Sequence, residues 1–384
     1  MPPPTLPRPG FSRRDHDLVC DGVPLAEIAA ATGTPVYVYS AATLRDRYRA
    51  IDEAFGGYPH ALHYALKANS TLAIARLLRE LGSAADANSV WEIETARRAG
   101  FDASQIVFTG VGKSPAELEC AVALGVKAIN VESAGELARV EALAARLDLV
   151  ARVAMRLNPD IDAKSHPHIS TGLKINKFGV ALDDALPVLA GLKVRPRLRL
   201  VAVHVHVGSQ ITSLEPLRRA AAFAAGIARE LRDQGAPIEY VDLGGGLGVS
   251  YDGSAVPSPA EYVSALLEEV RDSGLPMVLE PGRAIAAPAG ALLARVIDVK
   301  PRDAGSEFAV IDAGMTELLR PALYNAFHRV EPVIDRGNAS RRYEVVGPVC
   351  ESSDVVGRDR VLPQLAAGDL VAIGDAGAYG SVMA

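Results

Sequence analysis

The alternation of apolar and helix-forming segments between residues 60 and 285 most constrains the fold. Short apolar runs typical of buried strands recur there, and a stretch rich in Ala, Leu, Glu and Arg follows each of them. The strand-like runs are ALHYALKA, SAADA, IVFTG, AINVE, VAMRLN, VAVHVHV, YVDLGGG and MVLEPG. Eight alternating strand–helix units predict an α/β protein with a (β/α)8 barrel of the TIM type rather than an open sheet.

The chain on both sides of this region has a different pattern. After residue 290, strand-like runs are separated by turns instead of long helices, and similar runs stand near the N-terminus. A second, mainly β domain built from both chain ends is the simplest organisation. We expect residues 39–287 to form the barrel, and residues 1–38 and 288–384 to contribute to a β-barrel-like domain.

Composition argues against several classes of function. The formal net charge of −6 and the pI near 5.8 give no electrostatic basis for binding nucleic acid or an anionic membrane. No apolar run approaches the roughly 20 residues that span a bilayer, and the Pro-rich start lacks the apolar core of a secretory signal. The widely spaced Cys20, Cys120 and Cys350 fit neither a disulfide framework nor a zinc site, so we expect a cytoplasmic protein. Taken alone, Cys350 is more typical of a buried, inert thiol.

Polar residues and glycines stand at the carboxyl ends of the strand-like runs, where barrels of this type build active sites. Lys67 is the most unusual of them, because a buried ammonium is costly unless it is paired or loses its charge. Forming an imine with an aldehyde is one way to lose that charge. We expect Lys67 to lie in the strand, on the same side as Ala65 and His63. The other residues of this kind are Asp86, Asn88, Gly110, Glu132, Asn158, His206, Gly244 to Gly246 and Glu280.

Two glycine-containing motifs suggest nucleotide binding, and neither fits. A phosphate loop built on GVGKS would need a glycine at Val107, and a dinucleotide fingerprint counted from Gly244 has Val249 at its sixth position. Three consecutive glycines still let amide groups approach an anion closely, and such barrels commonly bind phosphate in the loops after strands seven and eight. The run is therefore either a phosphate site or a tight turn.

Two further segments each allow a functional and a structural interpretation. In EPGRAI, Glu280 could hold a proton on a heteroaromatic nitrogen and Arg283 could bind a carboxylate or phosphate, or the two could form an ion pair. In HVHVGSQI, His204 and His206 could bind a metal, although no third ligand has convincing spacing. Alternatively, His206 could stack on an aromatic cofactor while Ser209 donates to its phosphate.

A lysine, an aromatic ring, a glycine loop and an acid at four strand ends together suit pyridoxal 5'-phosphate. The chain also carries YALKAN, NPDIDAKSHPHISTGLKINKFG, HVHVGSQI, LGGGLGV, EPGRAI, GPVCESSD and GDAGAYG, in this order. With these motifs it resembles the barrel-type (alanine-racemase-fold) pyridoxal-phosphate decarboxylases over nearly its whole length. Among them it is most similar to the diaminopimelate decarboxylases.

The resemblance implies decarboxylation of meso-2,6-diaminopimelate to L-lysine and CO2, the last step of lysine biosynthesis, with no metal. It implies that Lys67 is the Schiff-base lysine, His206 the ring stacker, Glu280 the acid at the ring nitrogen and Cys350 the proton donor. It also implies a homodimer with shared active sites, in which Cys350 and Glu351 reach into the partner's site. The cofactor-binding positions that it adds are Ser209, Gly245, Gly246, Gly282, Arg283 and Tyr379. The substrate-binding positions are Arg283, Arg320, Tyr324, Glu351 and Tyr379.

Two alternatives remain open at this point. A decarboxylase of another basic or diamino acid, such as ornithine, arginine, lysine or carboxynorspermidine, would use the same mechanistic residues, although Glu351 and the STGLKINKFG loop favour diaminopimelate. A non-catalytic relative that binds a partner protein or only pyridoxal phosphate fits poorly with the joint presence of Lys67, Glu280 and Cys350. Family members usually continue beyond GDAGAYG, so we expect the C-terminal β domain to lack a stretch.

Overall fold

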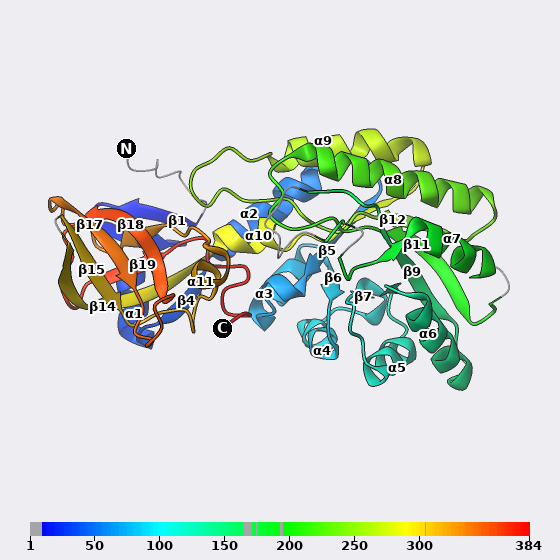
Figure 1. Ribbon diagram of the computed structural model, residues 1–384, viewed down its shortest axis with the longest axis horizontal. Helices are drawn as coiled ribbons and strands as arrows, with labels where there is room; N and C mark the ends of the chain where they lie inside the picture. Colours follow the sequence, from blue (N-terminus) through cyan, green and yellow to red (C-terminus); the bar gives the residue numbers. More distant parts are fainter. Residues whose placement is uncertain (1–9, 164–170, 174–175, 193–194, 304) are drawn as a thin grey trace. The chain divides into compact units, whose positions relative to one another are not determined.

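The fold is described from a computed structural model in which the chain divides into two compact units (Figure 1). The structure describes residues 10–163, 171–173, 176–192, 195–303 and 305–384. The barrel unit comprises the described residues of Tyr48–Gly248 and Val256–Gly282. The β unit comprises the described residues of Met1–Arg47, Val249–Ala255 and Arg283–Ala384. The domain boundaries expected after residues 38 and 287 stay a prediction, and part of the STGLKINKFG motif lies outside the described residues.

Parallel strands close into an eight-stranded barrel in the barrel unit, which confirms the predicted fold class. The strands are β5 (His60–Ala65), β6 (Ala84–Ala87), β7 (Ile106–Phe108), β8 (Ala128–Val131), β9 (Ala151–Asn158), β11 (Leu198–His204), β12 (Tyr240–Asp242) and β13 (Met277–Leu279). Strand β8 pairs with β9, and β13 pairs with β5, so the ring has no open edge. The short strand β10 (Val180–Ala181) pairs with the end of β9.

Helices follow these strands along the chain and surround the barrel (Figure 1). Four of them begin at a serine, whose hydroxyl accepts a hydrogen bond from the backbone N–H of a glutamate three residues later. The helices are α3 (Leu72–Glu80), α4 (Val90–Ala99), α5 (Pro115–Leu124), α6 (Ala134–Arg146), α7 (Leu182–Gly191), α8 (Leu214–Asp233) and α9 (Pro259–Val270). Among the described residues, no helix is both long enough and apolar enough to cross a membrane.

The β unit contains two sheets, as expected for a mainly β domain formed from both chain ends. The smaller sheet has strands β1 (Phe11–Arg14), β2 (Asp17–Cys20) and β3 (Val23–Pro24). The larger one has β4 (Val36–Tyr39), β14 (Gly290–Asp303), β15 (Ser306–Ile311), β16 (Val330–Pro332), β17 (Ser340–Val346), β18 (Val355–Pro363) and β19 (Leu370–Ile373). Leu292, Ile311, Tyr343 and Val371 are among the residues of its buried core. Its helices include α1 (Leu25–Thr32), α10 (Arg283–Ala286) and α11 (Arg320–Tyr324), and α2 (Ala41–Asp52) runs from this unit into the barrel unit.

The expectation that Lys67 lies within a strand was wrong. Strand β5 ends at Ala65, and Lys67 lies in the following 3-10 turn, η2 (Leu66–Ala68). The backbone N–H of Ala65 donates to Pro281 O at 3.2 Å, and a Cβ added at Gly282 would lie 2.9 Å from Ala68 Cβ. The chain therefore turns where it packs against the Pro281–Gly282 turn. This is a tertiary contact, which the local apolar pattern of ALHYALKA cannot predict.

Candidate active site

Lys67 presents its amine at the carboxyl end of the barrel, beside Asp86 in β6 and Asn88 just after it. Lys67 Nζ lies 3.3 Å from Asp86 Oδ2 and 3.4 Å from Asn88 Oδ1. The Lys67 side chain is 32% exposed, whereas that of Asp86 is fully buried. Both contacts are long for hydrogen bonds from an ammonium, and about a third of the side chain is open to solvent. An amine held in this way remains accessible to an aldehyde.

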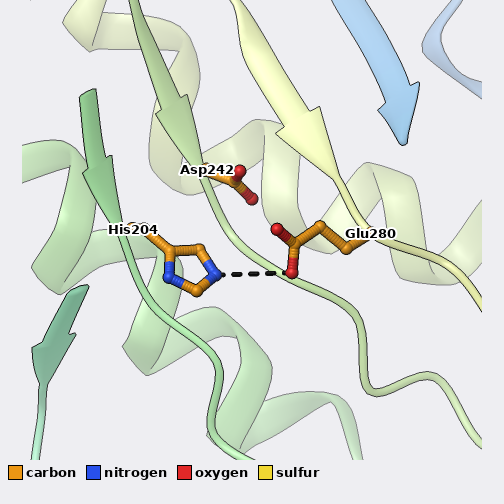
Figure 2. Close-up of side chains that lie close together, drawn as sticks. All are labelled: His204, Asp242 and Glu280. Carbon is orange, nitrogen blue, oxygen red and sulfur yellow. Dashed lines mark ion pairs between the residues drawn. The ribbon is translucent and has the colours of Figure 1, made fainter. Parts of the chain in front are cut away.

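Glu280 follows β13 and is a buried carboxylate at the same end of the barrel. His204 Nε2 lies 3.4 Å from Glu280 Oε2, and Asn130 Nδ2 donates to Glu280 Oε1 at 3.4 Å. The contact with His204 is an ion-pair distance without the geometry of a hydrogen bond. Figure 2 shows how His204, Asp242 and Glu280 converge from three neighbouring strands, β11, β12 and β13.

The two buried carboxyl groups in this cluster have opposite tendencies to ionise. Burial alone would raise the pKa of Glu280, but His204, Lys67 and His206 outweigh burial and bring that pKa well below its usual range. Burial and the neighbouring Glu280 raise the pKa of Asp242 well above its usual range. The arrangement therefore keeps Glu280 negatively charged, as a group that holds a proton on a nitrogen must be.

The structure brings possible metal ligands together around His204, but the group includes two carboxylates instead of His206. One nitrogen of His204 and one oxygen each of Asp242 and Glu280 lie within 4.8 Å of one another, and His206 is not part of this group among the described residues. The three donor types could hold a cation. The expectation that the site uses no metal stays a prediction.

The glycine loop after β12 lies against His206 and the backbone of Glu280. The N–H of Gly245 donates to His206 Nδ1 at 3.1 Å, so the neutral ring carries its proton on Nε2. A Cβ at Gly245 would lie 2.4 Å from Glu280 O, and one at Gly244 would lie 2.7 Å from His206 Nδ1. Burial and the nearby Lys67 lower the pKa of His206, which keeps the ring neutral. Half-buried Ser209 lies in the loop after β11.

These residues of the barrel unit fit pyridoxal phosphate by the chemistry of their donor groups. Lys67 would supply the amine and Glu280 the anion for the ring nitrogen. The glycine loop would offer a phosphate its backbone amides, although the N–H groups of Gly244 and Gly245 donate to Asp242 Oδ1 and His206 Nδ1 and would have to exchange these bonds. Gly282 has no room for a side chain beside Ala68, which fixes the turn that carries Glu280.

A second cluster, in the β unit, joins arginines to tyrosines. Arg283 Nη1 donates to Tyr251 OH at 2.8 Å, and Arg283 Cζ lies 4.7 Å from the centre of the Tyr379 ring. Arg320 Cζ lies 4.6 Å from the centre of the Tyr251 ring, and half-buried Tyr324 ends the same short helix, α11. Only 6% of Arg283 and 5% of Arg320 are exposed. Buried guanidinium groups held by neutral aromatic residues make a site for an anionic ligand.

Cys350 and Glu351 lie in the loop between β17 and β18 of the β unit, and both are exposed. The loop is held by Asp354, whose carboxylate accepts hydrogen bonds from the backbone N–H groups of Met315 at 2.6 Å and Val349 at 2.8 Å. The interpretation of Cys350 as a buried thiol was therefore wrong, because the thiol lies at the surface of a loop whose buried anchor is Asp354.

Sequence reasoning did not find several residues that complete these clusters. Asn130 and Asp242 were within predicted strands, and their positions at the carboxyl ends of β8 and β12 could have marked them. Tyr251 had no such signal, because it stands between barrel segments in the sequence but belongs to the β unit. His328, which contacts Arg320, also carried no motif.

Comparison with known proteins places the chain in a family. Residues 41–287 match the pyridoxal-dependent decarboxylase, pyridoxal binding domain. The diaminopimelate decarboxylase of Pseudomonas aeruginosa is 45% identical over 373 residues, which cover 97% of this chain and 89% of that protein. The crystal structure of diaminopimelate decarboxylase from Helicobacter pylori complexed with L-lysine superposes with a TM-score of 0.90 at 42% identity, over 94% of this chain and 90% of that one.

A decarboxylase named for other substrates is also similar, with a lower TM-score and a lower sequence identity. The crystal structure of lysine/ornithine decarboxylase from Vibrio vulnificus complexed with putrescine has a TM-score of 0.80 at 26% identity, and the alignment covers 94% of this chain and 93% of that one. The match over residues 41–287 makes pyridoxal phosphate the cofactor of this chain. The chain belongs to the family of pyridoxal-dependent decarboxylases.

Proposed function

We propose that this chain decarboxylates meso-2,6-diaminopimelate to L-lysine and CO2, the last step of lysine biosynthesis. The similarity to diaminopimelate decarboxylases at 45% identity over 97% of the chain supports this substrate. The observation that carries the reaction type is the buried, negatively charged Glu280 beside the glycine loop. Pyridoxal phosphate supplies, when bound, a protonated ring that accepts the electron pair released as CO2 leaves. Glu280 holds that ring proton, which favours decarboxylation over racemisation.

The barrel unit binds and orients the cofactor in this proposal. Lys67 is the amine that attaches it, and Asp86 and Asn88 orient Lys67 Nζ. The neutral ring of His206 faces the cofactor ring, and the glycine loop binds the phosphate, so a phosphate bond to the N–H of Gly245 would replace its bond to His206 Nδ1. The groups that complete this binding site are Ser209, Gly245, Gly246, Gly282, Arg283 and Tyr379.

The β unit supplies substrate recognition and a proton. Arg283 and Arg320 bind substrate carboxylate, with Tyr324 and Tyr379 beside them, and Glu351 binds the distal ammonium. Cys350 donates a proton to the carbon that has lost CO2. Because Cys350 and Glu351 are both exposed, they can enter the site of another molecule, and we infer a homodimer with shared active sites. The three free cysteines suit a reducing compartment, so we propose a cytoplasmic location.

The direct test is CO2 release from meso-diaminopimelate beside L-lysine, L-ornithine and L-arginine, with added pyridoxal phosphate. We expect release from diaminopimelate alone, with L-lysine as the other product. Release from one of the other amino acids would keep the reaction and overturn the substrate. A protein that shows the visible absorbance of bound cofactor but releases CO2 from none of the four would overturn the proposed function.

The shared site is tested by mixing two inactive variants. Lys67→Ala and Cys350→Ala should each lack activity, and the Cys350→Ala variant should keep the cofactor absorbance. If sites are shared, half of the dimers in an equal mixture contain one intact site, so the mixture should regain about a quarter of wild-type activity. A mixture as inactive as its components, with subunit exchange verified, would place both residues in one subunit's site.

A further inference from the structure

His328 is a buried histidine that no step of the proposed reaction uses. It is fully buried in the β unit, between the guanidinium of Arg320 and the backbone just after β19. His328 Nε2 lies 2.8 Å from Arg320 Nη1, and His328 Nδ1 lies 2.9 Å from Gly374 O. Both ring nitrogens are therefore engaged at distances typical of good hydrogen bonds.

These two contacts determine the protonation state of His328. A carbonyl oxygen only accepts, so Nδ1 carries a proton and donates it to Gly374 O. A guanidinium only donates, so Nε2 carries no proton and accepts from Arg320. The ring that satisfies both partners is one tautomer of the neutral imidazole. Burial, with Arg320 beside it, lowers the pKa of His328 to about 3, which agrees with a neutral ring.

A neutral acceptor holds Arg320 without cancelling its charge. Within the described part of the chain, Arg320 forms no ion pair with a carboxylate, and the nearby Asp375 is paired with Arg329 instead. The other groups beside the guanidinium are Tyr251, whose ring it faces, and Tyr324. Arg320 Nε is buried and has no hydrogen-bond partner among the described residues. An aspartate or glutamate in place of His328 would hold the guanidinium equally well, but it would neutralise the charge that an anionic ligand needs.

We propose that His328 is a positioning residue that fixes the orientation of Arg320 and preserves its charge for a ligand carboxylate. The inference rests on the proposed function, in which Arg320 binds a substrate carboxylate. Gly374 O sets the tautomer, His328 Nε2 holds one side of the guanidinium, and the Tyr251 ring covers its face. The donors that remain on Arg320 are then directed at the ligand before it arrives, which lowers the cost of ordering on binding.

The experiment measures binding of pimelate to the cofactor-loaded enzyme by isothermal titration calorimetry. Pimelate is the seven-carbon dicarboxylate, so it presents substrate-like carboxylates and cannot be decarboxylated through an amino group. We expect His328→Phe, which keeps a flat ring and loses both nitrogens, to weaken pimelate binding about tenfold or more. His328→Gln, whose amide offers both an acceptor and a donor, should recover part of that loss. The KM for diaminopimelate should rise in His328→Phe by a larger factor than kcat falls.

A double-mutant cycle separates positioning from a merely structural role. If His328 acts through Arg320, His328→Phe should have little further effect on pimelate affinity in an Arg320→Gln background. The matched control is His60→Phe in the barrel unit, since His60 also uses both ring nitrogens, with Tyr58 O and an Asp52 carboxylate oxygen. That control should leave pimelate affinity unchanged.

Three results would overturn the inference. One is pimelate affinity within twofold of wild type in a folded His328→Phe protein with normal cofactor absorbance. Another is an equal loss in the Arg320→Gln background. If His328→Phe does not fold, His328→Asn replaces it, because the shorter asparagine side chain cannot span both partners. The third result is unchanged pimelate affinity in that His328→Asn variant. Failure of diaminopimelate turnover in the wild type would reject the proposed function, whereas the coupling between His328 and Arg320 is read from pimelate alone.

Discussion

Replacing Lys113 by methionine should destabilise the barrel unit strongly. Only 1% of the Lys113 side chain is exposed, and Nζ donates to Gly110 O at 2.7 Å, Asn130 O at 2.7 Å and Glu136 Oε1 at 2.6 Å. An ammonium has three donors, so all of them are used. Methionine has nearly the same length, but it offers none of these donors and leaves the Glu136 carboxylate, 4% exposed, without its cation.

The expected cost follows from that unpaired carboxylate. Removing one partner of a buried ion pair costs about 3–5 kcal/mol, because the remaining charge stays desolvated. Glu136 Oε2 still accepts a hydrogen bond from the N–H of Glu132 at 3.0 Å, which favours the lower end of this range. Replacing both members, Lys113→Met with Glu136→Leu, should cost much less than the sum of the two single changes, because no buried charge is then left alone.

The assay is urea unfolding followed by far-ultraviolet circular dichroism, with the free energy of unfolding taken from the midpoint and the slope. The matched control is Arg98→Met, which removes the cation of an ion pair with Glu94 whose side chains are 71% and 40% exposed. That change should cost less than about 0.5 kcal/mol. Equal costs for Lys113→Met and Arg98→Met, or strictly additive costs in the double variant, would refute the reasoning.

Three other changes have defined outcomes. Glu280→Gln should lower the decarboxylation rate about 100-fold or more while the cofactor absorbance persists, and an unchanged rate would mean that another group holds the ring proton. Burial lowers the pKa of fully buried His63 to about 3, below its value of about 6.5 in the unfolded chain. As pH falls from about 6.5 to about 3, the unfolded chain binds a proton at His63 that the folded chain does not, so the folded state loses stability over that interval. Replacing His63 by leucine should therefore move the midpoint of acid unfolding, followed by circular dichroism, to lower pH. An unmoved midpoint would exclude His63 as a cause. In Asp354→Asn, an amide replaces the carboxylate that accepts hydrogen bonds from two backbone N–H groups. The loop that carries Cys350 should loosen, so kcat should fall about tenfold while the affinity for pimelate is retained. Normal kcat in a folded Asp354→Asn protein would show that the loop does not need this anchor.

The barrel was predictable because its signal is local and repeated. Each of the eight predicted runs overlaps an observed strand, and each strand leads into a polar rim, as in the step from β13 to Glu280. The strand-like runs predicted after residue 290 are ALLARVIDVK, FAVIDAGM, RRYEVVGPV and DLVAIGD, and none of them covers β18 (Val355–Pro363). Arg358, Asp359 and Arg360 interrupt the apolar pattern of that strand. It stands at the end of the strand order of its sheet, where exposed charges are tolerated.

The partners of the candidate site residues were much less predictable. Glu280 and Arg283 are three residues apart, and an ion pair between them was a reasonable structural interpretation. In the structure, the ion pair of Glu280 is with His204 and the short hydrogen bond of Arg283 is with Tyr251. His204 lies 76 positions before Glu280 and Tyr251 lies 32 positions before Arg283, and no local pattern around EPGRAI indicates either contact.

The chemical nature of those distant partners explains why the local interpretation fails. A Glu280–Arg283 pair would cancel two charges that the proposed reaction needs separately, one at a ring nitrogen and one at a carboxylate. His204 and Asn130 contact the anion without supplying a fixed full charge, and Tyr251 and His328 contact the two arginines as neutral groups. Neutral or titratable partners therefore leave both charges available for binding and catalysis, which a Glu280–Arg283 ion pair would not. Proximity in the sequence predicts a Glu280–Arg283 ion pair, whereas long-range packing brings His204 to Glu280 and Tyr251 to Arg283.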